Sequence, residues 1–246
     1  MTGATFDNLR VFEDCPSACH ESALYLENYV ADIIARNGQC RLAVSGGTTP
    51  WPMLSSFFRC GLPWQSVELF QTDERMAPEH SPDRNATHLI PLLPPGIHFH
   101  PMPYDTGGFP EEQAVAYEKE LEAHCGTPPI LDLVHLGLGP DGHTASLTLG
   151  DPVLDLVDRQ VASTRPYRGR IRLTLTVQTI RTAKTRLWLA CGPDKRQALD
   201  RCFRQDSTLP ASRVYRPSDP FFCDRLAAPD PGVTIRGPGS GIPPGS

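Results

Sequence analysis

Apolar residues recur along this chain in two patterns, one typical of amphipathic helices and one typical of buried strands. From residue 16 to residue 37 they return every three or four positions and Gly38 follows, which predicts a helix that ends at this glycine. Residues 131–136 (LDLVHL) form a nearly continuous apolar run, as in a strand that is buried on both faces. His135 is the polar exception in this run, and we expect it to be a packed core histidine.

The two patterns alternate over most of the chain. Further strands are predicted at residues 41–45, 67–72, 171–177 and 186–191, and further helices at 51–58, 85–93, 111–124, from about 143, and at 194–203. Strands that alternate with helices are joined by right-handed crossovers. The order therefore predicts a mostly parallel, Rossmann-like open α/β sheet with helices on both faces.

The composition sets the expected domain limits. No linker rich in Pro and Gly interrupts residues 1–228 and no repeat of fixed period occurs, so we expect one α/β domain there. Residues 229–246 consist largely of Pro, Gly and Ser, and so few apolar groups cannot offset the entropy cost of ordering the chain. This segment is predicted to be a flexible tail, and the residues before Asn8 are expected to fray.

The charge of the chain restricts its partners. It has 246 residues, with 23 Lys and Arg against 28 Asp and Glu, and a formal net charge of −5. This balance argues against nucleic acid and anionic membranes as partners, so an anionic ligand needs a local cluster of basic residues. With no signal-like segment and no run of ~20 apolar residues, we expect a cytoplasmic protein. The sequence does not reveal its oligomeric state, and a monomer or a weak homo-oligomer is the expectation.

The cysteines and histidines of the chain are candidate metal ligands, because these residue types bind transition metals most often. The eight cysteines are scattered, which favours reduced thiols over a disulfide framework. Cys15, Cys19 and His20 are close in sequence, but no second Cys or His pair follows at zinc-finger spacing, so no metal site is expected. His98 and His100 share one face of a short strand without a neighbouring carboxylate, and we expect both to be exposed.

Ligands of open α/β sheets bind at the carboxyl ends of the strands, and residues 45–49 (SGGTT) follow one such strand. Gly46 and Gly47 let the backbone approach an oxyanion, and Thr48 adds a hydroxyl donor. A plain strand-to-helix turn is the alternative interpretation. The loop has neither the Gly-Lys-Ser/Thr of a Walker motif nor the spacing of a dinucleotide fingerprint.

Residues 72–75 (TDER) end the next predicted strand with charged groups. Arg75 offers a guanidinium that binds phosphate or carboxylate in a bidentate manner, and a carboxylate beside it can orient a base. The alternative is that Asp73 or Glu74 caps the following segment while Arg75 pairs with the other carboxylate on the surface.

Residues 136–146 (LGLGPDGHTAS) carry the most informative pattern. A buried strand breaks into three glycines within six residues, which suits backbone that must approach a ligand. His143 follows Asp141 by two residues at a predicted strand-to-helix corner, where it is well placed as a general base. Ser45 and Ser146 lack the Gly-x-Ser-x-Gly elbow of a nucleophilic serine, so water is the expected nucleophile.

Basic residues cluster at two further places. Four arginines lead into the strand predicted at 171–177: Arg165, Arg168, Arg170 and Arg172. Basic residues at a strand edge most often serve solubility. Lys195 differs, because the Gly-Pro turn before it places its side chain near a helix start at the same rim as the other loops.

Together these segments resemble the 6-phosphogluconolactonase family, within the larger group that includes glucosamine-6-phosphate deaminase. The resemblance extends from about His20 to Ala228. The matching segments, in order, are LAVSGGTTP at 42–50, TDER at 72–75 with Asn85, LGLGPDGHTASL at 136–147, RIRLTLTVQTI at 170–180, ACGPDK at 190–195 and LPAS at 209–212. The Asp-Gly-His-Thr-Ala-Ser piece is the most specific of them.

The resemblance implies hydrolysis of 6-phospho-D-glucono-1,5-lactone to 6-phosphogluconate in the oxidative pentose phosphate pathway, without a metal or an organic cofactor. By the same resemblance, His143 deprotonates the attacking water and returns the proton to the ring oxygen that leaves. Asp141 or Asp73 orients or polarises this machinery. A lactone is already activated, so general base catalysis worth about 10²–10⁴ and positioning by the phosphate suffice.

The resemblance also implies a set of groups that hold the phosphate: the amides of Gly46, Gly47 and Thr48, the side chains of Arg75 and Lys195, and Arg170 as a further cation. Two departures from the family pattern are notable. Arg84 stands where a serine normally precedes Asn85, and we expect it either to reach the phosphate or to point outward. Cys191 stands where threonine is common.

Two other functions are consistent with parts of the pattern. The deaminases and isomerases of the glucosamine-6-phosphate type share the SGGTTP and GxGxDGH segments, but a glutamate follows their histidine within Ile-Ala-Phe-Asn-Glu-Pro. Here Thr144, Ala145, Ser146 and Leu147 follow, without that glutamate. A sugar-phosphate sensor with the same fold is the other alternative, and it normally carries an added DNA-binding helix-turn-helix.

Overall fold

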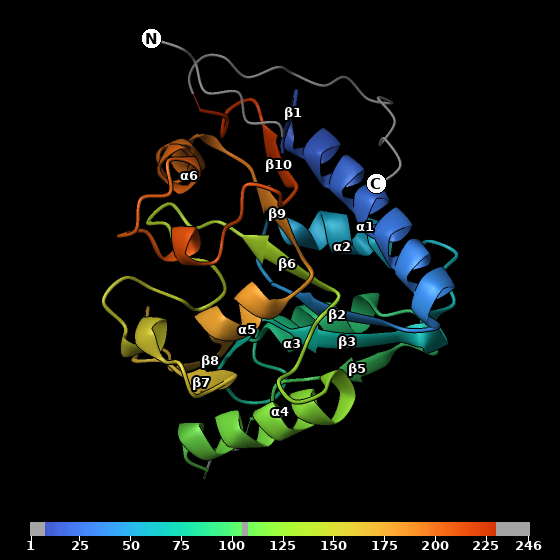
Figure 1. Ribbon diagram of the computed structural model, residues 1–246, viewed down its shortest axis with the longest axis vertical. Coiled ribbons are helices and arrows are strands. Elements are labelled where there is room, and N and C mark those ends of the chain that lie inside the picture. Colours follow the sequence, from blue (N-terminus) through green and yellow to red (C-terminus); the bar gives the residue numbers. More distant parts are fainter. Residues whose placement is uncertain (1–7, 105–107, 230–246) are drawn as a thin grey trace.

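Figure 1 shows the fold in a computed structural model, which describes residues 8–104 and 108–229. Seven strands form one sheet in the order β1-β10-β9-β6-β2-β3-β5, and every pair of neighbours is parallel. The strands are β1 (Leu9–Phe12), β2 (Cys40–Val44), β3 (Val67–Gln71), β5 (His98–His100), β6 (Leu133–Gly137), β9 (Thr185–Ala190) and β10 (Phe221–Asp224). The predicted parallel α/β architecture is confirmed.

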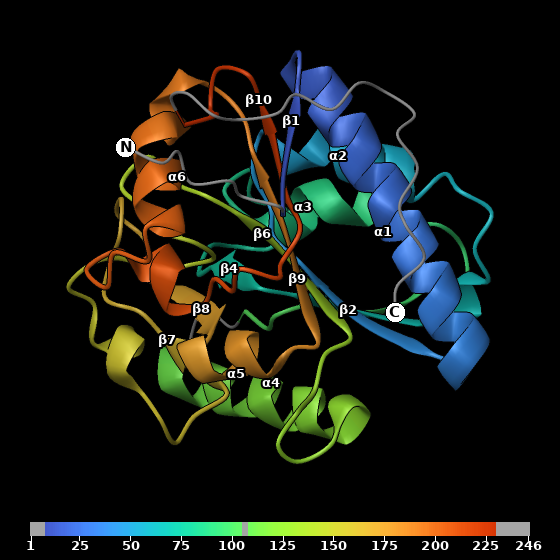
Figure 2. The same cartoon turned by 45° about the horizontal axis from the view of Figure 1, so that its top comes forward.

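Helices cover both faces of this sheet. They are α1 (Cys15–Asn37), α2 (Pro50–Phe57), α3 (Asn85–Leu89), α4 (Pro110–Cys125), α5 (Val177–Thr182) and α6 (Arg196–Phe203), with short 3₁₀ turns at Trp64–Ser66, Ile90–Leu92, Pro152–Asp155, Pro193–Lys195 and Pro210–Arg213. In Figure 2, α1 and α2 lie on one side of the sheet, and α4 and α6 lie on the other. Each face buries its own cluster of hydrophobic side chains.

Three more strands form a small antiparallel sheet in the order β4-β8-β7, with β4 at Asp73–Arg75, β8 at Arg172–Leu175 and β7 at Val161–Ser163. The segment predicted at 171–177 is thus a strand, but it lies outside the parallel sheet. The apolar residues of this segment would be buried in the large sheet as well as in the small one. The hydrophobic pattern could therefore not show which strand the segment pairs with. The chain passes between the sheets at Thr72, whose N–H donates to Val44 and whose carbonyl accepts from Leu175.

One predicted helix is wrong. Residues 138–150 form turns, with a single isolated bridge between Thr144 and Leu147. The physical reason is the backbone: Gly142 has φ 81° and Ala145 has φ 47°, and such left-handed residues interrupt a right-handed helix. His143 therefore lies in a folded loop rather than at a helix start.

The order of the strands positions the site. From β2 the chain proceeds outward to β3 and β5, whereas β6, β9 and β10 extend the sheet in the opposite direction. The boundary between β2 and β6 is a topological switch point, where loops diverge at the carboxyl ends of the strands and leave a crevice. The SGGTT loop follows β2, and the loop that carries His143 follows β6.

Some expectations concern residues beyond this description. The predicted fraying of residues 1–7 and nearly all of the predicted tail at 229–246 lie outside the described residues. The described part of the chain contains no helix that is both long and apolar enough to cross a membrane. All eight cysteines lie within it as free thiols, as predicted.

Candidate active site

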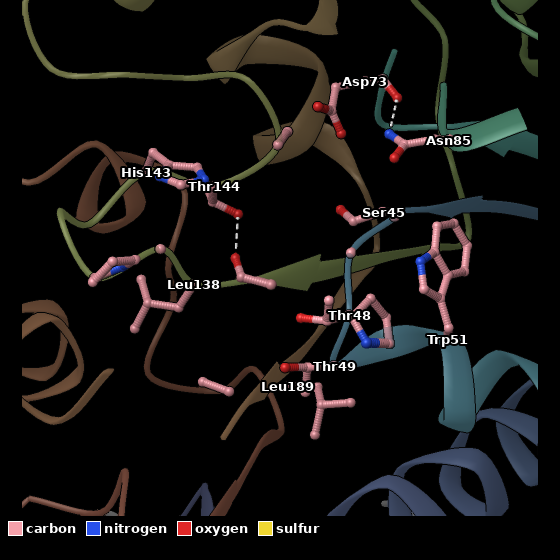
Figure 3. Close-up of a pocket in the computed structure, with 18 of the residues that line it drawn as sticks. Ser45, Thr48, Thr49, Trp51, Asp73, Asn85, Leu138, His143, Thr144 and Leu189 are labelled. Carbon is pink, nitrogen blue, oxygen red and sulfur yellow. Dashed lines mark hydrogen bonds between the residues drawn. The ribbon is translucent and has the colours of Figure 1, made fainter. Parts of the chain in front are cut away.

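A cavity of about 560 Å³ opens at the carboxyl ends of the strands, at the switch point between β2 and β6. Figure 3 shows His143 and Thr144 on one side of it, and Ser45, Thr48 and Trp51 on the other. Seven of the residues predicted from the sequence line this cavity: Gly46, Gly47, Thr48, Asp73, Arg75, His143 and Lys195. Loops that are far apart in the sequence thus converge on one pocket.

The histidine is oriented by a carboxylate. The Nδ1 atom of His143 lies 2.5 Å from Oδ1 of Asp141, and the hydroxyl of Tyr167 donates to Oδ2 at 2.9 Å. The hydrogen bond with His143 is the main reason why the pKa of Asp141 lies well below its usual range, although burial opposes this effect. Asp141 is therefore a carboxylate that fixes Nδ1 of the ring and leaves Nε2 available for a proton transfer.

The glycines of this loop bring the backbone against the ring. The amide of Gly139 donates to the carbonyl of His143 at 2.8 Å, and the amide of Gly142 donates to Gly139 at 2.9 Å. A Cβ atom on Gly139 would lie 2.1 Å from Nδ1 of His143. The hydroxyl of Thr144 donates to the carbonyl of Gly137 at 2.8 Å, which closes the loop at its base (Figure 3). The glycine-rich sequence is thus needed to place the imidazole.

Asp73 borders the pocket but is held by other groups. Its Oδ2 accepts a hydrogen bond of 2.6 Å from the hydroxyl of Ser146, and its Oδ1 accepts one of 3.2 Å from Thr72. Ser146 belongs to the same loop as His143, so Asp73 connects β4 to that loop. Among the described residues, Asp73 makes no hydrogen bond with His143, and Asp141 alone orients the ring.

Arg75 and the SGGTT loop are connected through Asn85. The Nη1 atom of Arg75 donates to Oδ1 of Asn85 at 2.5 Å, and the Asn85 amide donates to the carbonyl of Asp73 at 2.9 Å. A Cβ atom on Gly46 would lie 2.1 Å from the same Oδ1. The glycine therefore lets the loop approach the residue that positions the guanidinium. Lys195 also lines the pocket, and its Nζ lies 2.9 Å from Asp194.

Arg170 does not line the pocket, contrary to the expectation. Residues 167–170 form a tight hairpin turn in which Arg168 has φ 50° and Gly169 has φ 77°, as in a two-residue turn of type I′. The turn directs Arg168 to the pocket and Arg170 to Asp83, whose carboxylate lies 2.6 Å from its guanidinium.

Sequence reasoning did not assign Tyr167, Arg168 and Arg172 to the site. Arg168 and Arg172 line the pocket, and their guanidinium groups lie 5.2 Å and 5.0 Å from the centre of the Tyr167 ring. Burial lowers the pKa of Arg172. The segment YRGR gave only a weak signal, because Gly169 suits a positive φ angle but Arg168 stands where a type I′ turn usually has Asn, Asp or Gly.

Two charged residues near Arg75 have structural roles. Glu74 is buried and accepts hydrogen bonds from the amides of Asn85 and Ala86, so it caps α3, which is the alternative left open by the sequence. Arg84 is 7% exposed and donates to the carbonyl of Met102 at 2.9 Å. Arg84 thus points into the protein, neither outward nor to the pocket.

Two other histidines that the sequence singled out, His135 and His100, do not line the pocket. His135 is fully buried, as predicted, and burial lowers its pKa to about 3. The expectation that His100 is exposed without a carboxylate partner is wrong. Its Nε2 lies 2.5 Å from Glu68 of β3 and its Nδ1 lies 2.7 Å from Glu120 of α4, and neither partner is near it in the sequence.

The chain is similar in sequence to known proteins. The family model described as "Glucosamine-6-phosphate isomerases/6-phosphogluconolactonase" matches residues 13–222. The chain is 36% identical over 187 residues to a 6-phosphogluconolactonase of Synechocystis, which covers 72% of this chain and 77% of the relative. It is 32% identical over 212 residues to a 6-phosphogluconolactonase of Mesorhizobium japonicum, covering 81% of this chain and 86% of the relative.

Solved structures show the same fold. A crystal structure of a 6-phosphogluconolactonase from Thermotoga maritima superposes with a TM-score of 0.77 at 25% identity, over 90% of this chain and 99% of that one. A 6-phosphogluconolactonase from Trypanosoma cruzi gives a TM-score of 0.79 at 24% identity, over 92% and 98%. The chain belongs to the glucosamine-6-phosphate isomerase/6-phosphogluconolactonase family.

Proposed function

We propose that this protein is a 6-phosphogluconolactonase, which hydrolyses 6-phospho-D-glucono-1,5-lactone to 6-phosphogluconate in the oxidative pentose phosphate pathway. One observation carries the proposal: a histidine oriented by a carboxylate borders the same cavity as a glycine loop, a guanidinium and an ammonium group. The names of the relatives support the same reaction.

The phosphate binds at the side of the pocket formed by the SGGTT loop. The backbone amides of Gly46, Gly47 and Thr48 precede α2, so they and the helix N-terminus favour an anion. Arg75 and Lys195 add positive charge. Arg168 and Arg172 complete the set in place of Arg170, and the net charge of −5 makes this local concentration of cations the attractive region for a sugar phosphate.

The chemistry occurs at the side of the pocket formed by the His143 loop. The Nε2 atom of His143 takes a proton from water as the water oxygen attacks the lactone carbonyl, and a tetrahedral oxyanion forms. When this intermediate collapses, the bond between the carbonyl carbon and the ring oxygen breaks, and the imidazolium returns its proton to that oxygen. Asp141 stabilises the imidazolium through Nδ1. Asp73 is a positioning residue that holds Ser146 and the loop.

Deamination or isomerisation of an amino sugar phosphate is the second candidate. No Asp or Glu occurs between Gly142 and Gly150, where the deaminase pattern has its glutamate. Two of the polar side chains found there are engaged elsewhere: Thr144 donates to Gly137 and Ser146 donates to Asp73. Lactone hydrolysis needs no second acid at this position, so it fits the loop better.

The protein acts in the cytoplasm on a small molecule, as a monomer or a weak homo-oligomer, without nucleic acid or a membrane as partner. Two observations support this part of the proposal. The net charge is −5, and all eight cysteines are free thiols, as is usual in a reducing compartment.

A substrate comparison tests the function. The phosphorylated lactone is generated enzymatically and acid release is followed in excess of spontaneous hydrolysis, beside the same lactone without phosphate and glucosamine 6-phosphate with ammonia as readout. We expect rapid hydrolysis of the phosphorylated lactone, a much lower kcat/KM for the unphosphorylated one, and no ammonia. Ammonia release without lactone hydrolysis would establish the deaminase instead.

A further inference from the structure

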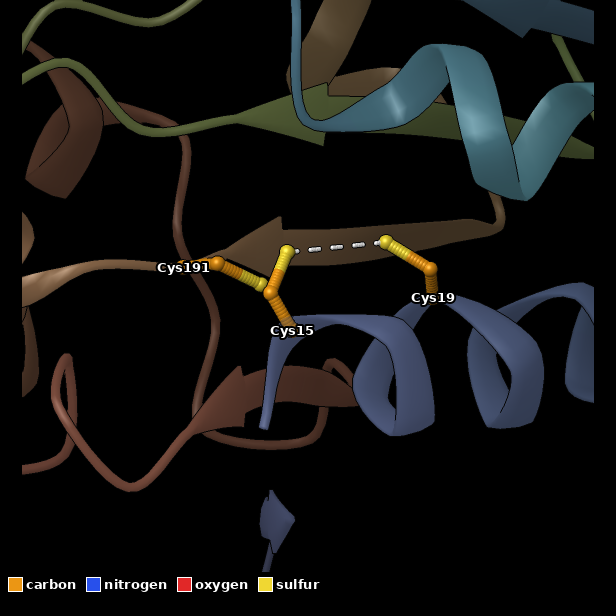
Figure 4. A group of neighbouring side chains, drawn as sticks. All are labelled: Cys15, Cys19 and Cys191. Atoms are coloured by element: carbon orange, nitrogen blue, oxygen red, sulfur yellow. Dashed lines mark hydrogen bonds between the residues drawn. The ribbon is translucent and has the colours of Figure 1, made fainter. Parts of the chain in front are cut away.

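Three cysteines gather next to the pocket, in a place that the proposed reaction does not use. One sulfur ligand atom from each of Cys15, Cys19 and Cys191 lies within 4.8 Å of the others. Figure 4 shows Cys15 and Cys19 projecting from the first turns of α1 toward the end of β9, where Cys191 follows. The fold thus unites residues that are more than 170 positions apart in the sequence.

The spacing of the sulfurs suits a metal ion better than a disulfide. The Sγ atoms of Cys15 and Cys19 are 3.8 Å apart. Tetrahedral zinc with Zn–S bonds of about 2.3 Å separates its sulfur ligands by about 3.8 Å. A disulfide requires about 2.05 Å between the two sulfurs. An ion therefore fits between these side chains with little change in the separation of this pair.

The burial of the cluster gives an ion access to it from one side. Cys19 and Cys191 are buried, so their sulfurs are enclosed by protein. Cys15 is only half-buried, which leaves an approach from solvent.

We propose that Cys15, Cys19 and Cys191 form a three-thiolate site for a thiophilic metal ion of the Zn²⁺ class, with a fourth position open to water. The sequence argued against a metal here because Cys15 and Cys19 have no second pair at finger spacing. The fold supplies Cys191 instead. Each thiol that binds releases its proton to solvent, as in other thiolate sites.

The second group of metal-binding residue types is a weaker candidate. Glu68, His100 and His124 also bring their ligand atoms within 4.8 Å. However, both ring nitrogens of His100 are already hydrogen-bonded to glutamates, at 2.5 Å and 2.7 Å. An ion would have to displace one of these charged hydrogen bonds, whereas the cysteine cluster has only weak S–H contacts to lose.

An ion at the cysteine site would connect three parts of the protein. The thiol of Cys19 donates to the carbonyl of Thr49, at 3.4 Å, at the end of the SGGTT loop. Cys191 is followed directly by the Gly192 turn that leads to Lys195, and Gly192 donates to the carboxylate of Asp224. The start of α1, the SGGTT loop and the Lys195 turn would thus share one attachment point, away from His143.

Cobalt provides the test on the fully reduced, full-length protein. Under anaerobic conditions, we expect Co²⁺ to produce thiolate-to-cobalt charge-transfer absorption that saturates at one equivalent and is bleached by Zn²⁺. The Cys15→Ser variant should weaken binding at least about tenfold. The Cys60→Ser variant is the matched control, because Cys60 is also half-buried but lies outside the cluster, and it should bind as the unmodified protein does.

A second measurement needs no substitution. Alkylation of the native protein with and without Zn²⁺, followed by peptide mass analysis, should show protection of Cys15, the half-buried cysteine of the cluster, and none of Cys60. The proposal is wrong if Co²⁺ gives no charge-transfer absorption, or if Cys60→Ser weakens binding as much as Cys15→Ser. It is also wrong if the protected peptides are others than those of Cys15, Cys19 and Cys191.

Discussion

Two clusters in this protein bring a histidine ring to carboxylates, and they differ in what is left for a ligand. At the pocket, His143 uses Nδ1 for Asp141, and its Nε2 has no hydrogen bond among the described residues. At the sheet edge, His100 uses both ring nitrogens for Glu68 and Glu120, and its ring stacks on Phe70 with 4.5 Å between the centres.

The difference shows that a histidine–carboxylate pair alone does not identify a catalytic site. The ring of His143 borders a cavity of about 560 Å³ that also contains the guanidinium of Arg75 and the ammonium group of Lys195. His100 belongs to β5, and both of its ring nitrogens are already paired, one with Glu68 of β3 and one with Glu120 of α4. Function follows from the unused nitrogen and the cations around it.

The largest effect is expected from removing each ring in turn. In His143→Ala, turnover of the phosphorylated lactone should fall by about 10²–10⁴, because the general base is lost. Binding of 6-phosphogluconate, measured by calorimetry, should persist. In His100→Ala, turnover should be retained and thermal stability reduced. Equal turnover in His143→Ala and the unmodified protein would remove the distinction between the two rings.

A smaller loss is expected when the ring of His143 is displaced but kept. Gly139→Ala places a Cβ atom 2.1 Å from Nδ1, so the imidazole must move from its bond with Asp141. A displacement of about 1 Å can cost about 10²-fold in turnover. Gly61→Ala is the control, since a Cβ atom there meets nothing within 4 Å. Unchanged kcat in Gly139→Ala would show that the orientation by Asp141 is dispensable.

The cations around the pocket are tested by two arginines of equal charge. Arg75→Ala should raise KM by about tenfold to hundredfold, because a charged hydrogen bond contributes about 1.5–3 kcal/mol. Arg170→Ala removes the same charge outside the pocket, where the side chain pairs with Asp83, and should leave KM unchanged. Similar KM values for the two variants would contradict the placement of the phosphate at Arg75.

The smallest effect concerns stability at the sheet edge. Burial alone would raise the pKa of Glu68, but the hydrogen bond from His100 and the nearby imidazoles give it a pKa below the ordinary 4.5. A lowered carboxyl pKa stabilises the fold above the unfolded-state value and loses this contribution as pH falls through the folded-state value. Glu68→Gln should therefore cost about 1–3 kcal/mol in free energy of unfolding near pH 7.

Denaturant unfolding at several pH values checks this prediction. The difference between the unmodified protein and Glu68→Gln should shrink as the pH falls below about 4.5, the ordinary pKa of glutamate. Glu120→Gln serves as a comparison, because its side chain is 47% exposed and its pairing with His100 is screened by solvent. A difference that grows toward low pH would reverse the assigned sign.

The parallel sheet and the pocket were predictable from the sequence because both depend on local patterns. Alternation of strand and helix gives the architecture, and the carboxyl ends of the strands give the site, so the SGGTT loop, Arg75, His143 and Lys195 were found together. His143 and Asp141 are close in the chain, so both could be named from the sequence, but the choice between Asp141 and Asp73 as the partner of the ring needed the structure.

The remaining features depend on contacts between distant segments. Tyr167 reaches Asp141 only because the hairpin of the small sheet folds over the pocket, and His100 meets Glu68 and Glu120 only after β3, β5 and α4 pack together. The helix expected near His143 was lost to the positive φ angle of Ala145, which the sequence does not signal because non-glycine residues rarely adopt it. The local pattern of apolar and polar residues does not show which residues from distant segments will meet.

The passage of the chain through Thr72 has a mechanical consequence. This one residue is tied by its N–H to Val44 in the large sheet and by its carbonyl to Leu175 in the small sheet, and its hydroxyl lies 2.7 Å from that of Ser45. Movement of the small sheet relative to the large one would therefore act on Thr72 and, through its hydroxyl, on Ser45, which lines the cavity. A ligand that touches the SGGTT loop and Arg172 at once would connect the large sheet to the small one. Binding of such a ligand should therefore slow amide exchange in both sheets together.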